Sequence, residues 1–190
     1  MLSAAECPSS PYDFSSVAER LQLRRFLPGF VSTVYFYARY RAFVSPKAEV
    51  EVSPLLTLGA ASRISSFTKI KASEGPLQIG RRVQVGCFCV LTSGVRGITI
   101  GDTCLVSPNV SIISSNYRYE RIDQPFLDQG LSSKGIRIED NVWLGAGARI
   151  LDGATIGSGA IVSPNSVVSG RVPANAIVQG NPAKVIFTRR

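Results

Sequence analysis

Branched aliphatic residues recur at every sixth position along most of the chain. A period of six belongs neither to a helix, which repeats near 3.6 residues, nor to a flat strand, which repeats at two. The step falls on sixteen residues, all Ile, Leu or Val, in four runs: Ile138, Leu144, Ile150, Ile156, Val162 and Val168; Ile100, Val106 and Ile112; Ile79, Val85 and Leu91; Val52, Leu58, Ile64 and Ile70.

Six residues suffice for one short strand and one corner, so three such units close a triangular coil. No single coil buries its apolar side alone, whereas stacked coils share one continuous core. The pattern therefore predicts an all-β fold, a left-handed parallel β-helix of hexapeptide repeats. The pairs expected to stack are Ile138 with Ile156, Leu144 with Val162, and Ile150 with Val168.

Residues at the predicted corners support this fold. Gly directly follows several of the aliphatic residues, where we expect the backbone to bend. The fourth residue after the aliphatic is small or β-branched, as a tight interior corner requires: Val83, Cys89, Cys104, Val110, Val142, Ala148, Ala154, Ala160 and Ser166.

Interruptions of the period indicate where chain leaves the coils. Three extra residues enter between Ile70 and Ile79, and three more between Leu91 and Ile100. The large break is residues 113–135, a polar, aromatic and charged stretch. We predict that it is an ejected loop, and such loops are usually functional.

The N-terminal part lacks the six-residue period and is predicted to be helical over residues 1–43, with the β-helix domain over 44–187. Residues 16–19 have the form of a capping box for a helix to Leu27, and a second helix is expected from about Phe30 to Arg41. Its face of Phe30, Val34, Tyr37 and Arg41 is expected to pack on the end of the β-helix. The alternative is a basic, aromatic helix on a membrane surface.

Composition limits the location and the chemistry. Of the 190 residues, 45% are hydrophobic, and no apolar stretch is long enough to span a bilayer. The first ten residues show no secretory signal, so we expect a cytoplasmic protein with reduced thiols. The net charge of +8 suits an anionic partner, although several arginines fall on the predicted helices. The chain has no histidine, the commonest general base and metal ligand.

Two motifs narrow the family. Residues 136–147 read Ile-Arg-Ile-Glu-Asp-Asn-Val-Trp-Leu-Gly-Ala-Gly, and residues 180–186 read Gly-Asn-Pro-Ala-Lys-Val-Ile. With the hexapeptides between them, they resemble the hexapeptide-repeat acyltransferases, close to the galactoside, maltose and polysaccharide O-acetyltransferases. The resemblance covers roughly residues 44–187. It implies a homotrimer with acetyl-CoA in a groove between adjacent prisms and a carbohydrate acceptor beneath the ejected loop.

The resemblance also implies roles for individual residues. Trp143 and Ala146 would line the acyl-CoA groove, and Lys184 would lie near the CoA phosphates. A packed aromatic and a solvated charge are the alternative interpretations of Trp143 and Lys184. The pantetheine arm would be flanked by four residues: Ser163, Pro164, Ser169 and Gly170. The family often has Thr-Lys at Ser169-Gly170, and Arg171 is a candidate substitute.

The ejected loop departs from the family at the position of its general base. Family members carry histidine where this chain has Tyr117, within Ser-Ser-Asn-Tyr-Arg-Tyr at residues 114–119. A phenol ordinarily titrates near pH 10, so it is a poor base at pH 7. Losing such a base typically costs on the order of 10²–10⁴-fold in rate.

Four explanations of Tyr117 remain open at this point. In the first, the tyrosine is natural and leaves a weakened or inactive enzyme. In the second, a carboxylate of the loop has taken over the role of general base. In the third, the tyrosine was introduced by engineering, and in the fourth, the loop aligns differently with the family. The candidate carboxylates are Glu120, Asp123 and Asp128.

The cysteines do not indicate a metal site. Cys89 and Cys104 fall at the small interior corner positions, whereas Cys87 points elsewhere, so a tetrahedral set is incomplete. Without histidine, a carbonic anhydrase is excluded as well. By resemblance, Cys89 and Asn116 would border the acceptor pocket.

The sequence thus favours an acetyl-CoA-dependent O-acetyltransferase that acts on a sugar or polysaccharide precursor, without a metal. The alternative from another class is a non-catalytic trimer that binds acyl-CoA or sugar, or scaffolds a partner. A nucleic-acid-binding protein is disfavoured because no groove-reading motif is present. Peripheral membrane contact through residues 1–43 is the remaining alternative.

Overall fold

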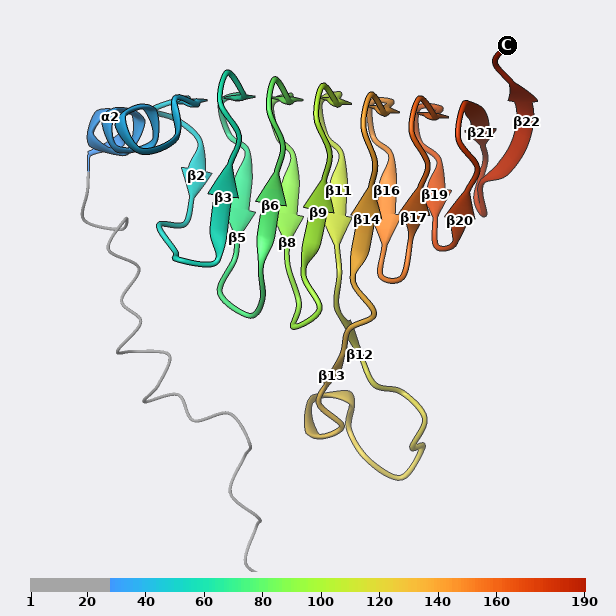
Figure 1. Ribbon diagram of the computed structural model, residues 1–190. Helices are drawn as coiled ribbons and strands as arrows, with labels where there is room; N and C mark the ends of the chain where they lie inside the picture. The colour runs from blue at the N-terminus through green and yellow to red at the C-terminus, as the bar shows by residue number, and fades with distance from the viewer. Residues whose placement is uncertain (1–27) are drawn as a thin grey trace, which may run out of the picture.

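A computed structural model describes residues 28–190, which form a three-sided prism of short parallel strands with one helix at its N-terminal end (Figure 1). Each coil contributes one strand to each of three sheets, and each strand pairs with its counterpart in the next coil. The chain is therefore a left-handed parallel β-helix, as predicted. The capping box at residues 16–19 and the helix expected to Leu27 lie outside the described residues.

The three sheets are named A, B and C in the order in which each coil visits them, and each corner is named by the sheets it joins. Sheet A holds β1 (Phe43–Val44), β4 (Arg63–Ile64), β7 (Gln84–Val85), β10 (Leu105–Val106), β15 (Trp143–Leu144), β18 (Ile161–Val162), β21 (Ala176–Gln179) and the antiparallel β22 (Lys184–Thr188). Sheet B holds β2 (Glu49–Val50), β5 (Lys69–Lys71), β8 (Val90–Thr92), β11 (Ser111–Ile113), β16 (Arg149–Leu151) and β19 (Val167–Val168). Sheet C holds β3 (Leu56–Leu58), β6 (Leu77–Ile79), β9 (Ile98–Ile100), β14 (Ile136–Ile138), β17 (Thr155–Ile156) and β20 (Arg171–Val172).

The six-residue steps form the core of the prism. The three stacking pairs occur as predicted: Ile138 with Ile156, Leu144 with Val162, and Ile150 with Val168. Every other residue of the sixteen is buried except Val52, which is half-buried. In that coil Val50 points inward instead, and the regular step begins only after an insertion between β2 and β3.

The glycines that follow the aliphatic residues are required by the close approach of the next coil and not, as expected, by a bend of the backbone. Gly59, Gly80 and Gly101 do not have positive φ angles, but each lies against the backbone of the next coil. A Cβ on Gly59 would lie 2.3 Å from the carbonyl carbon of Gly80. The left-handed corner positions fall elsewhere, often on asparagine, which tolerates that conformation: Asn109, Asn141, Asn165 and Asn175.

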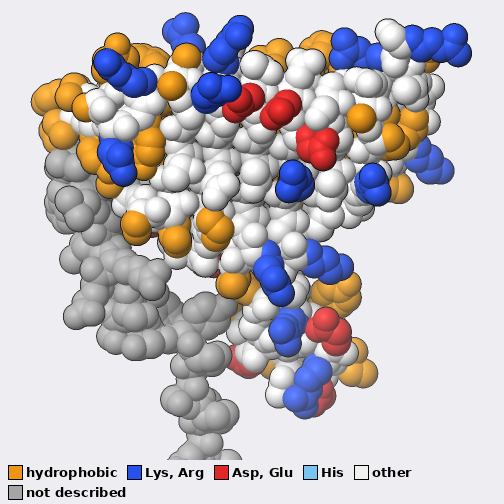
Figure 2. All heavy atoms as spheres, in the orientation of Figure 1, with side chains coloured by type: hydrophobic (Ala, Val, Ile, Leu, Met, Phe, Trp, Pro, Cys, Tyr) orange, Lys and Arg blue, Asp and Glu red, His pale blue; other side chains and the backbone are white. Residues whose placement is uncertain are grey.

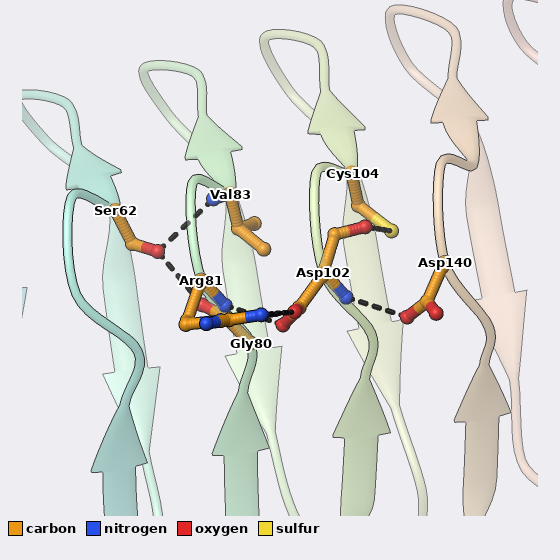
Figure 3. Close-up of polar contacts among 7 residues, drawn as sticks. All are labelled: Ser62, Gly80, Arg81, Val83, Asp102, Cys104 and Asp140. Atoms are coloured by element: carbon orange, nitrogen blue, oxygen red, sulfur yellow. Dashed lines mark hydrogen bonds and ion pairs between the residues drawn. The ribbon is translucent and has the colours of Figure 1, made fainter.

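Carboxylates tie successive coils together along the C–A corner (Figure 3). Asp102 accepts hydrogen bonds from the backbone N–H of Arg81 at 2.7 Å and from its Nε at 3.1 Å. Asp140 in turn accepts the backbone N–H of Asp102 at 2.7 Å. These bonds hold the pKa of Asp102 below its ordinary value, mainly through the backbone N–H of Arg81.

Helix α2 (Gly29–Tyr40) lies across the N-terminal end of the prism (Figure 1). The prediction of which helix face packs there is wrong, because Phe30, Val34 and Tyr37 are exposed. The inward residues are Phe36, which is 1% exposed, and Tyr40, whose hydroxyl donates to the Leu56 carbonyl at 2.9 Å. Within residues 28–190, no helix has the length and apolarity needed to cross a membrane.

All insertions leave the prism at the B–C corner. The extra residues between β5 and β6 and between β8 and β9 lie there, and so does the long loop between β11 and β14. This loop contains the antiparallel pair β12 (Asn116–Tyr117) and β13 (Leu131–Ser132) and the 3-10 helix η2 (Phe126–Asp128), and it projects away from the coils (Figure 1). The ejected loop is therefore confirmed.

Candidate functional site

Five of the residues implied by the resemblance lie along the A–B corner and at its C-terminal end: Trp143, Ala146, Ser163, Pro164 and Lys184. Ala146 and Pro164 occupy the same corner in successive coils, because the Ala146 carbonyl accepts the N–H of Asn165 at 2.9 Å. Ala146 and Pro164 are both exposed. The fold thus brings residues far apart in the sequence into one surface row.

Trp143 points outward from sheet A and is 45% exposed, so its indole is not an interior packing residue. Its Nε1 donates a 3.0 Å hydrogen bond to Oγ of Ser107 in the preceding coil. This bond holds the indole along the A–B corner. One face of the ring system is therefore positioned to cover a ligand that lies in the row.

The C-terminal segment continues the row beyond the last corner. The Ala183 N–H donates to the Val167 carbonyl at 2.8 Å, and the Gly180 N–H donates to Oγ of Ser166 at 3.1 Å. Lys184 follows directly at the start of β22 and is exposed. Within residues 28–190 it forms no ion pair, so its ammonium group is available to an anion.

Ser169 and Gly170 lie apart from this row. They form the B–C corner between β19 and β20, and both are exposed. Sheet B therefore separates them from Trp143 and Ala146 on the same prism. The loop that carries Tyr117 is rooted on this same B–C corner, two coils earlier.

The base of the loop is rigidly attached to the coils. The carboxylate of Asp152 accepts the N–H groups of Lys134 and Gly135 at 2.8 Å. Oγ of Ser133 donates to the Ser114 carbonyl at 2.6 Å, and Oγ of Ser114 accepts the Gly94 N–H at 2.9 Å. These contacts hold both ends of the loop where it leaves the prism.

Tyr117 lies in β12 opposite Leu131 and is 49% exposed. Within residues 28–190 its hydroxyl makes no hydrogen bond. Asn116 precedes it, is also exposed, and accepts the Ser132 hydroxyl on its carbonyl at 3.4 Å. The two residues are therefore presented to solvent on the projecting hairpin.

The loop carboxylates have partners of their own. Asp123 accepts from Arg121 Nη2 at 2.7 Å and from its Nε at 3.2 Å, and these bonds hold the pKa of Asp123 below its ordinary value. Glu120 accepts the N–H of Tyr119 at 3.2 Å. A carboxylate stabilised in its ionised form is a weaker base, so Asp123 is poorly suited to accept a proton.

The cysteines are interior packing residues, with one consequence for the acceptor site. Cys89 and Cys104 are 0% and 2% exposed, and burial raises the pKa of both thiols. Within the described residues, no cluster of potential metal ligands occurs. The side chain of Cys89, which was expected to border the acceptor pocket, points into the prism, and its Sγ contacts the Ser107 carbonyl at 3.2 Å.

The sequence did not single out Ser107 or Arg149 as functional residues. Ser107 belongs to the turn Val106–Asn109, so its role as partner of Trp143 depends on coil stacking. Nη1 of Arg149 donates to the Asn109 carbonyl at 2.7 Å and to the Gly147 carbonyl at 2.9 Å, which places a cation beside the same corner. Neither contact has a signal in the sequence.

Comparison with known proteins identifies the repeats. Residues 135–170 match the family described as bacterial transferase hexapeptide (six repeats), and residues 76–114 match the hexapeptide repeat of succinyl-transferase. A probable acetyltransferase of Mycobacterium tuberculosis is 30% identical over 159 residues, which are 82% of this chain and 53% of that protein. The chain thus spans about half the length of that relative.

Two further proteins are similar. WbbJ of Escherichia coli, named as an O-acetyl transferase of lipopolysaccharide biosynthesis, is 28% identical over 78% of this chain and 76% of that protein. A variant of AntD, an N-acyltransferase from Bacillus cereus solved with dTDP and coenzyme A, has a TM-score of 0.71 at 19% identity. The superposition covers 83% of this chain and 88% of AntD, and it shows that the two proteins share the fold.

Proposed function

Because the chain belongs to the hexapeptide-repeat acyltransferases, we propose that it transfers an acetyl group from acetyl-CoA to a hydroxyl of a sugar or polysaccharide precursor. The observation that carries this proposal is the A–B row, in which Trp143, Ser163 and Lys184 follow one another along the prism. WbbJ, named as an O-acetyl transferase of lipopolysaccharide biosynthesis, supports the acceptor class. AntD, which shares the fold, was solved with coenzyme A.

The division of the implied residues between two corners supports a site shared between subunits. Trp143 and Lys184 lie at or beyond the A–B corner, whereas Ser169 and the root of the Tyr117 loop lie on the B–C corner. In the homotrimer that this proposal requires, the A–B corner of one prism would face the B–C corner of the next. Acetyl-CoA would lie in that groove, with the indole of Trp143 against the pantetheine arm and Lys184 near a phosphate.

The reaction is a single displacement. The acceptor oxygen attacks the thioester carbonyl carbon, the new C–O bond forms, and the C–S bond breaks. The hydroxyl proton leaves the acceptor and ends on the departing CoA thiolate. Holding the two reactants in one groove accelerates this step even without a strong base, because their encounter is no longer bimolecular.

Tyr117 would position the acceptor hydroxyl and not deprotonate it. A neutral phenol donates and accepts hydrogen bonds, and Tyr117 is exposed on the hairpin where the family carries its base. The bonds to Arg121 make Asp123 a weak replacement, so Glu120 is the better candidate of these two. We therefore expect slow turnover.

The second candidate function is a trimer that binds acyl-CoA or sugar without turnover. The Tyr117 hydroxyl, which has no hydrogen-bond partner within residues 28–190, favours it. Thiol release from acetyl-CoA, measured with a panel of sugars, separates the two functions. Activity that persists in Tyr117→Phe and disappears in Glu120→Gln identifies Glu120 as the base. Acetyl-CoA binding with no thiol release, together with release in Tyr117→His, identifies the non-catalytic protein. Absence of binding of acetyl-CoA and of every sugar in the panel contradicts both functions.

A further inference from the structure

Two phenylalanines on the A–B corner stack on each other at the surface. The ring centroids of Phe67 and Phe88 are 5.1 Å apart with 12° between the ring planes. The residues are 54% and 58% exposed. They occupy equivalent positions in successive coils, because each follows by three residues one member of the paired residues Ile64 and Val85.

Both residues have the left-handed backbone conformation, with φ of 60° and 58°. Bulky side chains rarely adopt it. The next three coils have Asn109, Gly147 and Asn165 at this corner position, which are residues that tolerate it. The left-handed backbone belongs to the corners themselves, since Ala61, Arg82 and Thr103 adopt it at the C–A corner. Phe67 and Phe88 differ from these residues in carrying two stacked rings that remain more than half exposed.

Phe88 has a ring partner on one face only within residues 28–190. Phe67 is flanked by Lys47, whose Nζ lies 5.9 Å from the ring centroid, and by Phe88 on its other side. The opposite face of Phe88 is directed toward the next coil, where the corner carries Asn109. The Asn109 side chain is exposed and its amide bonds to none of residues 28–190.

The corner that carries Phe88 belongs to the same edge of the prism as the candidate cofactor site. Trp143 lies two coils further along the prism, which corresponds to about 10 Å at the usual strand spacing. The Trp143 indole bonds to Ser107, two residues before Asn109. A ligand unit on Phe88 would therefore lie one or two sugar residues from a thioester held beside Trp143.

We propose that Phe88, supported by Phe67, is a stacking platform for a pyranose ring of an oligosaccharide acceptor. The C–H groups on one face of a pyranose are electropositive and pack on the negative face of an aromatic ring. The Asn109 amide supplies a donor and an acceptor for the sugar hydroxyls. The proposal rests on the proposed function for the identity of the ligand, and it predicts a preference for oligosaccharides over monosaccharides.

Binding measured without turnover tests the platform. In saturation-transfer NMR with maltohexaose, chitohexaose and an α2,8-linked sialic acid tetramer, we expect at least one probe to receive saturation at its ring protons. Phe88→Asn should weaken that binding by about tenfold, the equivalent of one lost stacking contact. Phe88→Tyr keeps the ring and should retain binding, and Phe30→Ala removes a comparably exposed ring of α2 as the matched control.

Asparagine suits the left-handed position, so Phe88→Asn should unfold at the same temperature as the wild type or a higher one. Equal binding by Phe88→Asn and the wild type, or no binding of any probe to the wild type, overturns the proposal. A change of subunit number in Phe88→Asn, measured by light scattering, also overturns it, because the rings would then form a contact between copies. Saccharide binding that depends on Phe88 without any acetyl transfer supports the platform and contradicts only the proposed function.

Discussion

The indole Nε1 of Trp143 donates a 3.0 Å hydrogen bond to Oγ of Ser107, although 36 residues separate them in the sequence. The long loop lies between them, and the two residues meet because it leaves the prism at another corner. The bond fixes the orientation of a half-exposed aromatic residue at the candidate groove.

This relationship makes a direct binding prediction, because Trp143 is the single tryptophan of the chain. Acetyl-CoA should change the intrinsic fluorescence, and titration should give its Kd. Ser107→Ala should weaken binding about two- to tenfold, as expected for one lost hydrogen bond. Ser111→Ala is a control on the adjacent sheet; if it has the same effect, the Trp143–Ser107 contact does not position the indole.

Restoring a base should increase the rate. In Tyr117→His, thiol release in the presence of an acceptor should rise by about 10²–10⁴-fold. The rate should increase with pH through about 6.5, where an imidazole loses its proton. Tyr119→His places the same group two residues away and should stay at the wild-type rate. An unchanged rate in Tyr117→His would contradict the placement of the acceptor at this hairpin.

Close stacking of the coils predicts a difference between two glycines. Gly59→Ala places its Cβ against the backbone of Gly80 and should lower the free energy of unfolding by about 1–3 kcal/mol. Gly170→Ala places its Cβ in open space and should change stability by less than about 0.5 kcal/mol. Urea unfolding of the two variants measures both values, and similar losses would contradict the close approach at Gly59.

The C–A corner should make stability depend on pH. Because the pKa of folded Asp102 lies below its ordinary value of 3.8, its contribution is complete above that value and is lost as pH falls through the folded-state pKa. Asp102→Asn keeps an oxygen for the Arg81 N–H but loses the charge. Its melting temperature should be lower than that of the wild type at pH 7, and the difference should shrink below about pH 4.

Asp128→Asn is the matched control for this measurement, because that carboxylate bonds to no residue of the described part of the chain. Its melting temperature should follow the wild type at every pH. A difference between Asp102→Asn and the wild type that stays constant down to pH 2 would show that the charge of Asp102 is not involved.

The period of six predicts most of the prism because every inward position is buried and therefore requires an apolar side chain. It fails at Val52, where an insertion shifts the inward position to Val50. On helix α2 it was the helical spacing that failed, since the aromatic stripe of Phe30 and Tyr37 faces outward and Phe36 packs inward. Helical spacing identifies a stripe but does not determine which of two apolar faces meets the prism.

Less of the candidate site than of the fold could be predicted from the sequence. Motifs identified Trp143 and Lys184, but the partner Ser107 depends on which coils are neighbours. The six-residue period placed Cys89 correctly at an interior corner, whereas its role beside the acceptor was implied by the resemblance alone. The exposure of Phe67 and Phe88 has no sequence signal either, since their left-handed backbone is a property of the corner.

Confining all additional chain to the B–C corner has an evolutionary consequence. A deletion or graft between Ile113 and Ile136 alters the projecting hairpin while the other two edges of the prism keep their register. Under the proposed function, variation in acceptor choice would thereby be uncoupled from the integrity of the scaffold. A new hairpin transplanted at this edge inherits an intact binding row and a complete hydrophobic interior.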